Sequence, residues 1–187
     1  IAEIPARDLH SAIYMLGNGA GKARMTKDAV PEEKRVWKLA LISSGEISIQ
    51  EKLKEGRLEV MAGQEVRLID VEADNRAFGV FDDLHQMASG SLFSEAIARA
   101  TSQFHGAVGK VFVERLVCRV ADNKLDAIVS LIQKTATGWL EKLDGAADGQ
   151  IARVANRFAL IAIAGEIATY SGLTGWATGE ARSSAQS

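Results

Sequence analysis

Two short apolar runs rich in branched residues lie in the first half of the chain, at residues 36–42 and 66–71. Each run has polar groups at one end, which is typical of a buried strand in a parallel sheet. In open α/β sheets the ends of such strands border the crevice that holds the ligand. The two runs therefore predict an α/β fold in which both strands lie in one parallel sheet.

Polar side chains accompany both runs. Ser43, Ser44, Gly45 and Glu46 follow the first run, and Arg67 lies at the start of the second. A hydroxyl at one strand tip and a cation beside the next strand suit a site that binds and cleaves a phosphate anhydride. The sequence thus predicts that Ser43, Ser44 and Arg67 act in catalysis. It predicts that Gly45 and Glu46 lie near the nucleotide.

Ordinary structural roles are open for the same residues. Ser43, Ser44 and Glu46 also suit the cap of a helix that begins just after them. Arg67 equally suits a surface ion pair with a nearby carboxylate. Sequence alone leaves both interpretations open.

Helical patterns fill most of the remaining sequence. Pro5 suits an early helical position, and apolar residues then recur on one face until a glycine-rich stretch ends the helix. Further helices are predicted at residues 91–104, 110–120, 123–143 and 150–170. The predicted organisation is an α/β region at residues 1–80 followed by an all-α region at residues 81–187.

The glycine-rich stretch is not a phosphate-binding loop, because Leu16 and Ala23 stand where that loop needs a glycine and a hydroxyl. Lys22, Arg24 and Lys27 follow in a polar stretch that is expected to form an exposed basic loop. Glycines allow such a loop to lie against a phosphate backbone, and its cations can displace condensed counterions. These three residues are the predicted DNA contacts.

Composition narrows the function classes further. A formal net charge of −2 gives no global attraction to nucleic acid, so any such contact must be local. The single cysteine, Cys118, excludes an internal disulfide and favours a cytoplasmic setting, and its apolar neighbours predict a buried side chain. The histidines share no metal-ligand spacing, so no metal site is predicted. No apolar stretch is long enough to span a bilayer, so no membrane contact is predicted.

Several segments, taken together and in order, resemble a bacterial family known as domain of unknown function 927, which is described as helicase-like ATPases of phages and mobile elements. The matching pieces cover almost the whole chain: Tyr14-Met-Leu-Gly-Asn-Gly-Ala-Gly-Lys-Ala-Arg24, the run from Trp37 into Ser44-Gly-Glu46, Ala62-Gly-Gln-Glu-Val-Arg-Leu-Ile-Asp70, Gly79-Val-Phe-Asp-Asp-Leu-His85, Gly149-Gln-Ile-Ala-Arg-Val-Ala-Asn-Arg-Phe158, Ala164-Gly-Glu166 and Gly172-Leu-Thr-Gly-Trp176. The shared order makes this resemblance more specific than any one motif.

The resemblance implies the distal half of a RecA-like P-loop ATPase sheet followed by a helical extension. The longer parent protein would couple ATP hydrolysis to action on DNA. Its phosphate-binding loop and the acidic pair that holds Mg²⁺ are expected to precede Ile1. The parent would then bind ATP and Mg²⁺, whereas this piece alone would be inactive.

The resemblance also implies roles for single residues. Ser43 and Ser44 resemble the sensor of the terminal phosphate in P-loop ATPases. Arg67 resembles an arginine that completes the site of a neighbouring subunit, which implies a homo-oligomeric ring. The basic loop then occupies the position of a hairpin that projects toward DNA in related ring helicases.

The alternative is a non-catalytic binding or oligomerisation module whose helical half forms a subunit interface. The two hypotheses differ in the upstream sequence that they require. A phosphate-binding loop and an acidic pair before Ile1 support the ATPase, and a parent that lacks both supports the module. A free-standing small-molecule enzyme is disfavoured, because no convergent nucleophile, base and orienting group can be named.

Overall fold

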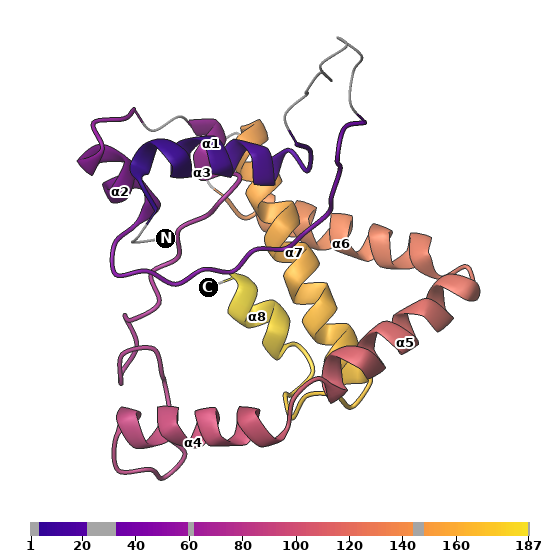
Figure 1. The fold of residues 1–187 in the computed structure, drawn as a ribbon. Helices are drawn as coiled ribbons and strands as arrows, with labels where there is room; N and C mark the ends of the chain where they lie inside the picture. The colour runs from indigo at the N-terminus through magenta and orange to yellow at the C-terminus, as the bar shows by residue number, and fades with distance from the viewer. Residues whose placement is uncertain (1–3, 22–32, 60–61, 144–147, 187) are drawn as a thin grey trace. The chain divides into compact units, whose positions relative to one another are not determined.

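The computed structural model describes residues 4–21, 33–59, 62–143 and 148–186 (Figure 1). Its contacts divide the chain into two compact units, Ile1–Val71 and Glu72–Ser187. The boundary predicted from the sequence lies after residue 80. The described residues of both units form helices joined by irregular segments, and none of these residues forms a β-strand. The predicted α/β fold with a RecA-like parallel sheet is therefore wrong.

The two apolar runs predicted as strands adopt other structures. Residues 36–42 form no helix or strand and have one isolated antiparallel bridge, between Val36 and Ala20. Large apolar side chains of this run are exposed, namely Leu39, Leu41 and Ile42. Residues 66–71 begin in the turn after helix α3 (Ala62–Glu65) and continue as irregular chain. A strand needs a hydrogen-bonded neighbour along its length, and neither run has one among the described residues.

Two helices supply the core of the first unit. α1 (Ala6–Gly17) packs against α2 (Ile49–Glu55). Their buried side chains form one cluster with two partly buried leucines packed against it: Leu9, Ile13, Ile49 and Leu53, with Leu58 and Leu68. Gly56 lies directly against Ala6, where a Cβ would overlap the alanine. The glycine that ends α2 therefore permits the close approach of the two helices.

Both ends of α2 are closed by local hydrogen bonds. The Ser48 hydroxyl accepts from the Glu51 N–H at 3.1 Å, and the Glu51 carboxylate accepts from the Ser48 N–H at 2.9 Å, which completes a capping box. At the other end Arg57 adopts a left-handed φ of 54°, and the Leu58 N–H donates to the Leu53 carbonyl at 3.0 Å. This turn places Leu58 against the core.

Acidification is expected to weaken α2 through Glu51. Hydrogen bonds from the Ser48 N–H and hydroxyl hold the pKa of the Glu51 carboxyl below its ordinary value of 4.5. A carboxyl whose pKa is lowered on folding contributes stability above its unfolded-state pKa, and that stability is lost as the pH falls through the folded-state pKa. The amide protection factors of residues 49–55, which correct hydrogen exchange for its intrinsic pH dependence, should therefore be smaller below pH 4.5 than at neutral pH, and Glu51→Gln should remove part of this difference.

Glu55→Gln is the matched control for that experiment, because it removes a carboxylate of the same helix outside the cap. Both variants lose one carboxylate of α2, so a difference between them reports the capping hydrogen bonds and not the loss of a charge. An identical pH dependence of exchange in α2 for Glu51→Gln and Glu55→Gln would contradict the role of the cap.

The second unit contains four long helices, α4 (Gly90–Gln103), α5 (Ala107–Ala121), α6 (Leu125–Leu140) and α7 (Gly149–Tyr170), and the short helix α8 (Glu180–Gln186). The helices predicted for this half of the chain are present. α7 packs against both α6 and α8, as Figure 1 shows. The buried residues of these helices are mostly small, namely Thr135, Ala136, Ala159, Ala162 and Ile163. No helix in the described part of the chain is long and apolar enough to cross a membrane.

A glycine and a glutamate of α7 fix the position of α8. A Cβ at Gly165 would lie 2.6 Å from the Cβ of Ala181, so the absence of a side chain lets the helices touch. The Glu166 carboxylate accepts from the Gly179 N–H at 2.9 Å and from the Arg182 N–H at 3.1 Å. These donors are among the N–H groups that a helix start leaves unpaired, so Glu166 caps α8 from the neighbouring helix.

Candidate functional site

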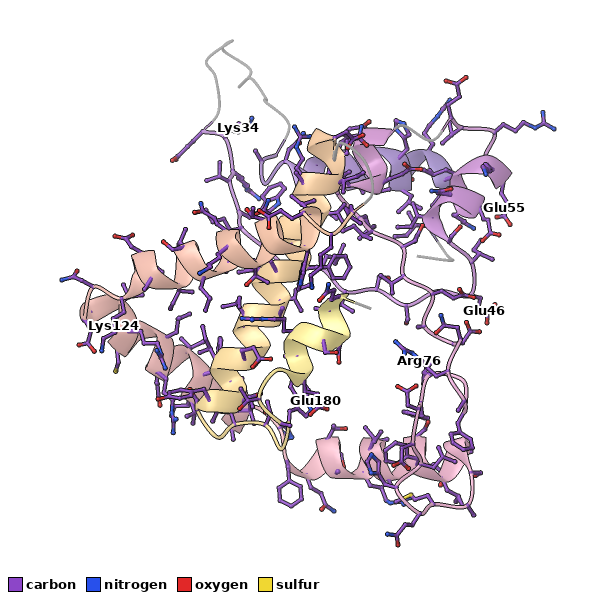
Figure 2. All side chains as sticks on the ribbon, turned by 180° about the vertical axis from the view of Figure 1, so that it is seen from behind. Lys34, Glu46, Glu55, Arg76, Lys124 and Glu180 are labelled. Atoms are coloured by element: carbon purple, nitrogen blue, oxygen red, sulfur yellow. The ribbon has the colours of Figure 1, made fainter. Side chains whose placement is uncertain are left out.

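The predicted sensor serines lie on an exposed, extended stretch of the first unit. Ser43 and Ser44 are exposed, as are Gly45 and Glu46 beside them, and Figure 2 shows Glu46 on a segment without helix or strand. The helix that follows is capped by Ser48, so neither the predicted catalytic role nor the alternative capping role is assigned to Ser43 and Ser44. Their place in catalysis stays a prediction.

Arg67 is held by contacts within the first unit. Its Nε and Nη2 donate to Oδ1 of Asn18 at 3.2 and 3.0 Å, and its Nη1 donates to the Gly63 carbonyl at 2.5 Å. The guanidinium carbon lies 5.1 Å from the ring centroid of Tyr14. Three nitrogens and one face of the guanidinium are thus engaged. In this arrangement Arg67 ties the turn after α3 to the end of α1.

The glycine-rich stretch after α1 uses its N–H groups internally. The N–H groups of Asn18, Gly19 and Gly21 all donate to carbonyls of the same unit, at 2.9, 3.1 and 2.9 Å. Among the residues that the structure describes, no group of three or more His, Cys, Asp or Glu side chains is placed to hold a metal ion. No catalytic step is assigned to this glycine-rich stretch. Lys22, Arg24 and Lys27 lie outside the described residues.

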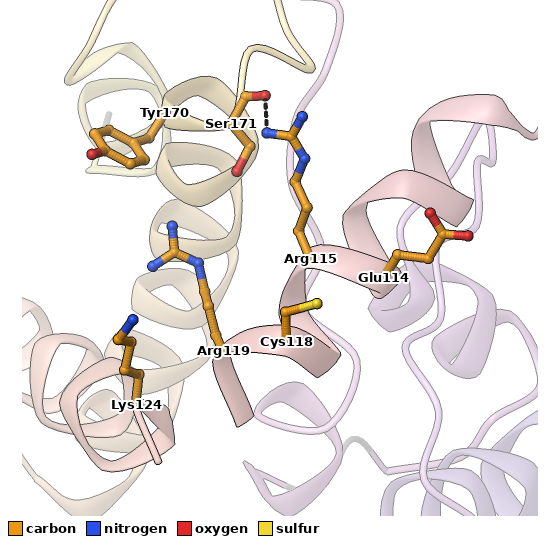
Figure 3. Close-up of a pocket in the computed structure, with 7 residues that line it drawn as sticks. All are labelled: Glu114, Arg115, Cys118, Arg119, Lys124, Tyr170 and Ser171. Atoms are coloured by element: carbon orange, nitrogen blue, oxygen red, sulfur yellow. Dashed lines mark hydrogen bonds between the residues drawn. The ribbon is translucent and has the colours of Figure 1, made fainter. Parts of the chain in front are cut away.

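Charged side chains converge in the second unit, around a hollow of about 490 Å³ that Figure 3 shows in close-up. We call it the cationic hollow, and its lining residues are Glu114, Arg115, Cys118, Arg119, Lys124, Tyr170 and Ser171. Three of the lining side chains are cationic and one is a carboxylate, so the lining carries a net positive charge. Figure 2 shows Lys124 at the turn between α5 and α6.

The local sequence explains why these cations share one place. Arg115 and Arg119 are four residues apart on α5 and therefore lie on one face of the helix. Asn123 then adopts a left-handed φ of 56°, and the Lys124 N–H donates back to the Arg119 carbonyl at 2.9 Å. α7 ends in a similar turn at Gly172, with φ 68°. α5 and α7 therefore both end in a left-handed turn, and Lys124 and Ser171 of these two turns line the hollow.

Specific contacts join the two helices across the cationic hollow. Nη1 of Arg115 donates to the Ser171 carbonyl at 2.6 Å, and the guanidinium carbon of Arg119 lies 5.9 Å from the ring centroid of Tyr170. Lys124 pairs with Asp122 at 2.9 Å. Guanidinium groups present several donors in a geometry that matches phosphate oxygens, and an ammonium adds a point charge. The arrangement suits the binding of a phosphate group.

Sequence reasoning missed this site and placed one of its residues wrongly. Cys118, predicted to be buried, is exposed and lines the hollow. The spacing of Arg115 and Arg119 was the available signal, because it places two cations on one helix face. Tyr170 is 55 residues further along the chain than Arg115, and only the folded structure brings its ring to them.

No family model, curated protein or solved structure matches the chain. The resemblance to the family of domain of unknown function 927 therefore stays a prediction that rests on the motifs quoted above.

Proposed function

We propose that the chain is the DNA-contacting part of a DNA-associated, ATPase-like protein, and that its second unit contacts the phosphate backbone at the cationic hollow. The ATPase part of this proposal rests on the sequence resemblance alone. ATP and Mg²⁺ would be bound by other parts of the parent protein, as the resemblance implies. The DNA part rests on the hollow.

The observation that carries the proposal is the convergence of Arg115, Arg119 and Lys124 on one hollow of a chain whose overall charge is slightly negative. Association with nucleic acid needs a local concentration of cations when the whole chain supplies none. Cations that neutralise phosphates release condensed counterions, and this release dominates sequence-independent binding. The hollow supports binding without base-pair readout.

Replacement of both arginines, Arg115→Ala with Arg119→Ala, is expected to weaken DNA binding and to flatten its salt dependence. Each phosphate contact contributes about 0.9 to the slope of log K against log salt on a duplex, and about 0.7 on a single strand. The double variant should therefore lose about 1.8 of that slope on a duplex, or about 1.4 on a single strand. Fluorescence anisotropy of labelled oligonucleotides at several salt concentrations measures both quantities.

Arg99→Ala provides the matched control, because Arg99 is an exposed arginine of α4 that pairs with Glu95 outside the hollow. This variant should keep the affinity and the slope of the unaltered chain. Equal loss in the control and the double variant would refute the hollow as the contact. Absence of binding to duplex and single-stranded DNA alike would refute the DNA-contacting function.

A further inference from the structure

We propose that the cationic hollow takes single-stranded DNA, with one base stacked on the ring of Tyr170 and the adjoining phosphates on Arg115, Arg119 and Lys124. This inference rests on the proposed function and specifies the form of DNA that the site prefers. Two features carry it: the exposure of the tyrosine ring and its direct connection to the cations.

Tyr170 is the last residue of α7, and 85% of its surface is exposed. The guanidinium of Arg119 lies near the ring at 5.9 Å from its centroid, as Figure 3 shows. A guanidinium beside one face of an aromatic ring leaves the opposite face for another partner. High exposure means that the rest of the chain does not cover that face. The ring is therefore open to a flat, apolar ligand group.

The ring and the phosphate-binding groups are linked through the backbone. Arg115 donates at 2.6 Å to the carbonyl of Ser171, the residue directly after Tyr170. This hydrogen bond uses one of the five N–H donors of the guanidinium, and the others remain for a ligand. A nucleotide combines the two chemistries that the hollow offers, because its base stacks and its phosphate accepts charged hydrogen bonds.

An exposed ring discriminates between single and double strands. Bases in a duplex are stacked on one another, and extrusion of one costs a few kcal/mol. Bases in a single strand are available to any aromatic side chain, and stacking is tolerant of sequence since every base has a π-face. The cations alone would bind both forms, so the ring supplies the preference.

Tyr170→Ala is expected to weaken binding to labelled oligothymidylate of about twelve nucleotides by about 5- to 150-fold, the contribution of one base–ring stack. Tyr170→Phe keeps the aromatic face and should stay within about threefold of the unaltered chain. Binding to a hairpin duplex should change by less than about threefold in either variant, because its bases do not reach the ring. Anisotropy with the whole chain measures each affinity.

Phe104→Ala is the matched control, because Phe104 is an aromatic residue of the same unit that is 80% exposed and lies outside the hollow. It should leave oligothymidylate binding unchanged. Circular dichroism and thermal unfolding of every variant check that the fold is retained. A fold lost with Tyr170→Ala still leaves Tyr170→Phe and the comparison of single strand with duplex as tests.

Three results would overturn the inference without refuting the proposed function. One is tighter binding of the duplex than of oligothymidylate, which would leave the proposed DNA function intact. Another is an equal effect of Tyr170→Ala on both DNA forms. The third is competition by free ATP at the affinity of the oligonucleotide, which would make the hollow a mononucleotide site. A chain that binds neither DNA form would refute the proposed function together with this inference.

Discussion

Leu53→Ala is expected to destabilise the first unit by about 2–5 kcal/mol, the usual range for truncation of a buried leucine. Leu53 is 0% exposed and lies in a small core cluster that, among the residues the structure describes, has four buried members. Because the surrounding core is small, few side chains can move into the cavity that the truncation leaves. Because domains are stabilised by only about 5–15 kcal/mol, this loss is a large share of the stability of a small unit.

Urea unfolding measures this effect when Trp37 is the sole tryptophan, in a background with Trp139→Phe and Trp176→Phe, because Trp37 lies in the first unit and the other two in the second. Leu41→Ala is the control: the same truncation at a side chain that is 48% exposed should cost less than about 1 kcal/mol. If the two variants unfold at the same urea concentration, the helices of this unit do not share the core described here.

Gly165→Ala and Gly138→Ala are expected to change the stability of the second unit in opposite directions. Both glycines lie within helices, and alanine there gains about 0.5–1 kcal/mol from the lower entropy of the unfolded chain. Open space surrounds a Cβ at Gly138, whereas a Cβ at Gly165 would lie 2.6 Å from the Cβ of Ala181. Overpacking of this kind costs about 1–3 kcal/mol.

Thermal unfolding reports the sign of each change, and hydrogen exchange of residues 180–186 reports whether α8 remains docked. Gly138→Ala should raise the midpoint and leave α8 protected. Gly165→Ala should lower the midpoint, accelerate exchange in α8, or do both. Stabilisation by both substitutions would show that α8 does not rest against α7 at this point.

Helices were predictable from this sequence because their signals are local. α7 is capped at its start by Asp148, whose carboxylate accepts from the Gln150 and Ile151 N–H groups at 2.8 and 2.9 Å, and it ends before a left-handed glycine. Both features follow from neighbouring residues. The capping box of Ser48 and Glu51 is equally local and was present in the sequence as a serine followed three residues later by a glutamate.

The predicted sheet failed because a strand is not a local structure. Residues 36–42 have the composition of a strand, but composition does not supply the neighbouring strand that completes the hydrogen bonds. The catalytic role of Arg67 was likewise predicted from its position at the start of an apolar run. Its partner Asn18 lies 49 residues earlier, and this separation gives no signal in a single sequence.

The candidate site was beyond prediction for the same reason. Arg115 and Arg119 share a helix face, which their spacing reveals, but the hydrogen bond from Arg115 to Ser171 joins residues 56 positions apart. Only packing of α5 near the end of α7 makes the cationic hollow.

That hydrogen bond has a thermodynamic consequence. An arginine side chain free in solvent loses much rotational entropy when a ligand immobilises it. Arg115 is already held by the Ser171 carbonyl, so most of this entropy is lost during folding. An anion that binds later contacts a guanidinium group whose position is already fixed. Its contribution to association should accordingly be more enthalpic than that of a freely rotating surface cation.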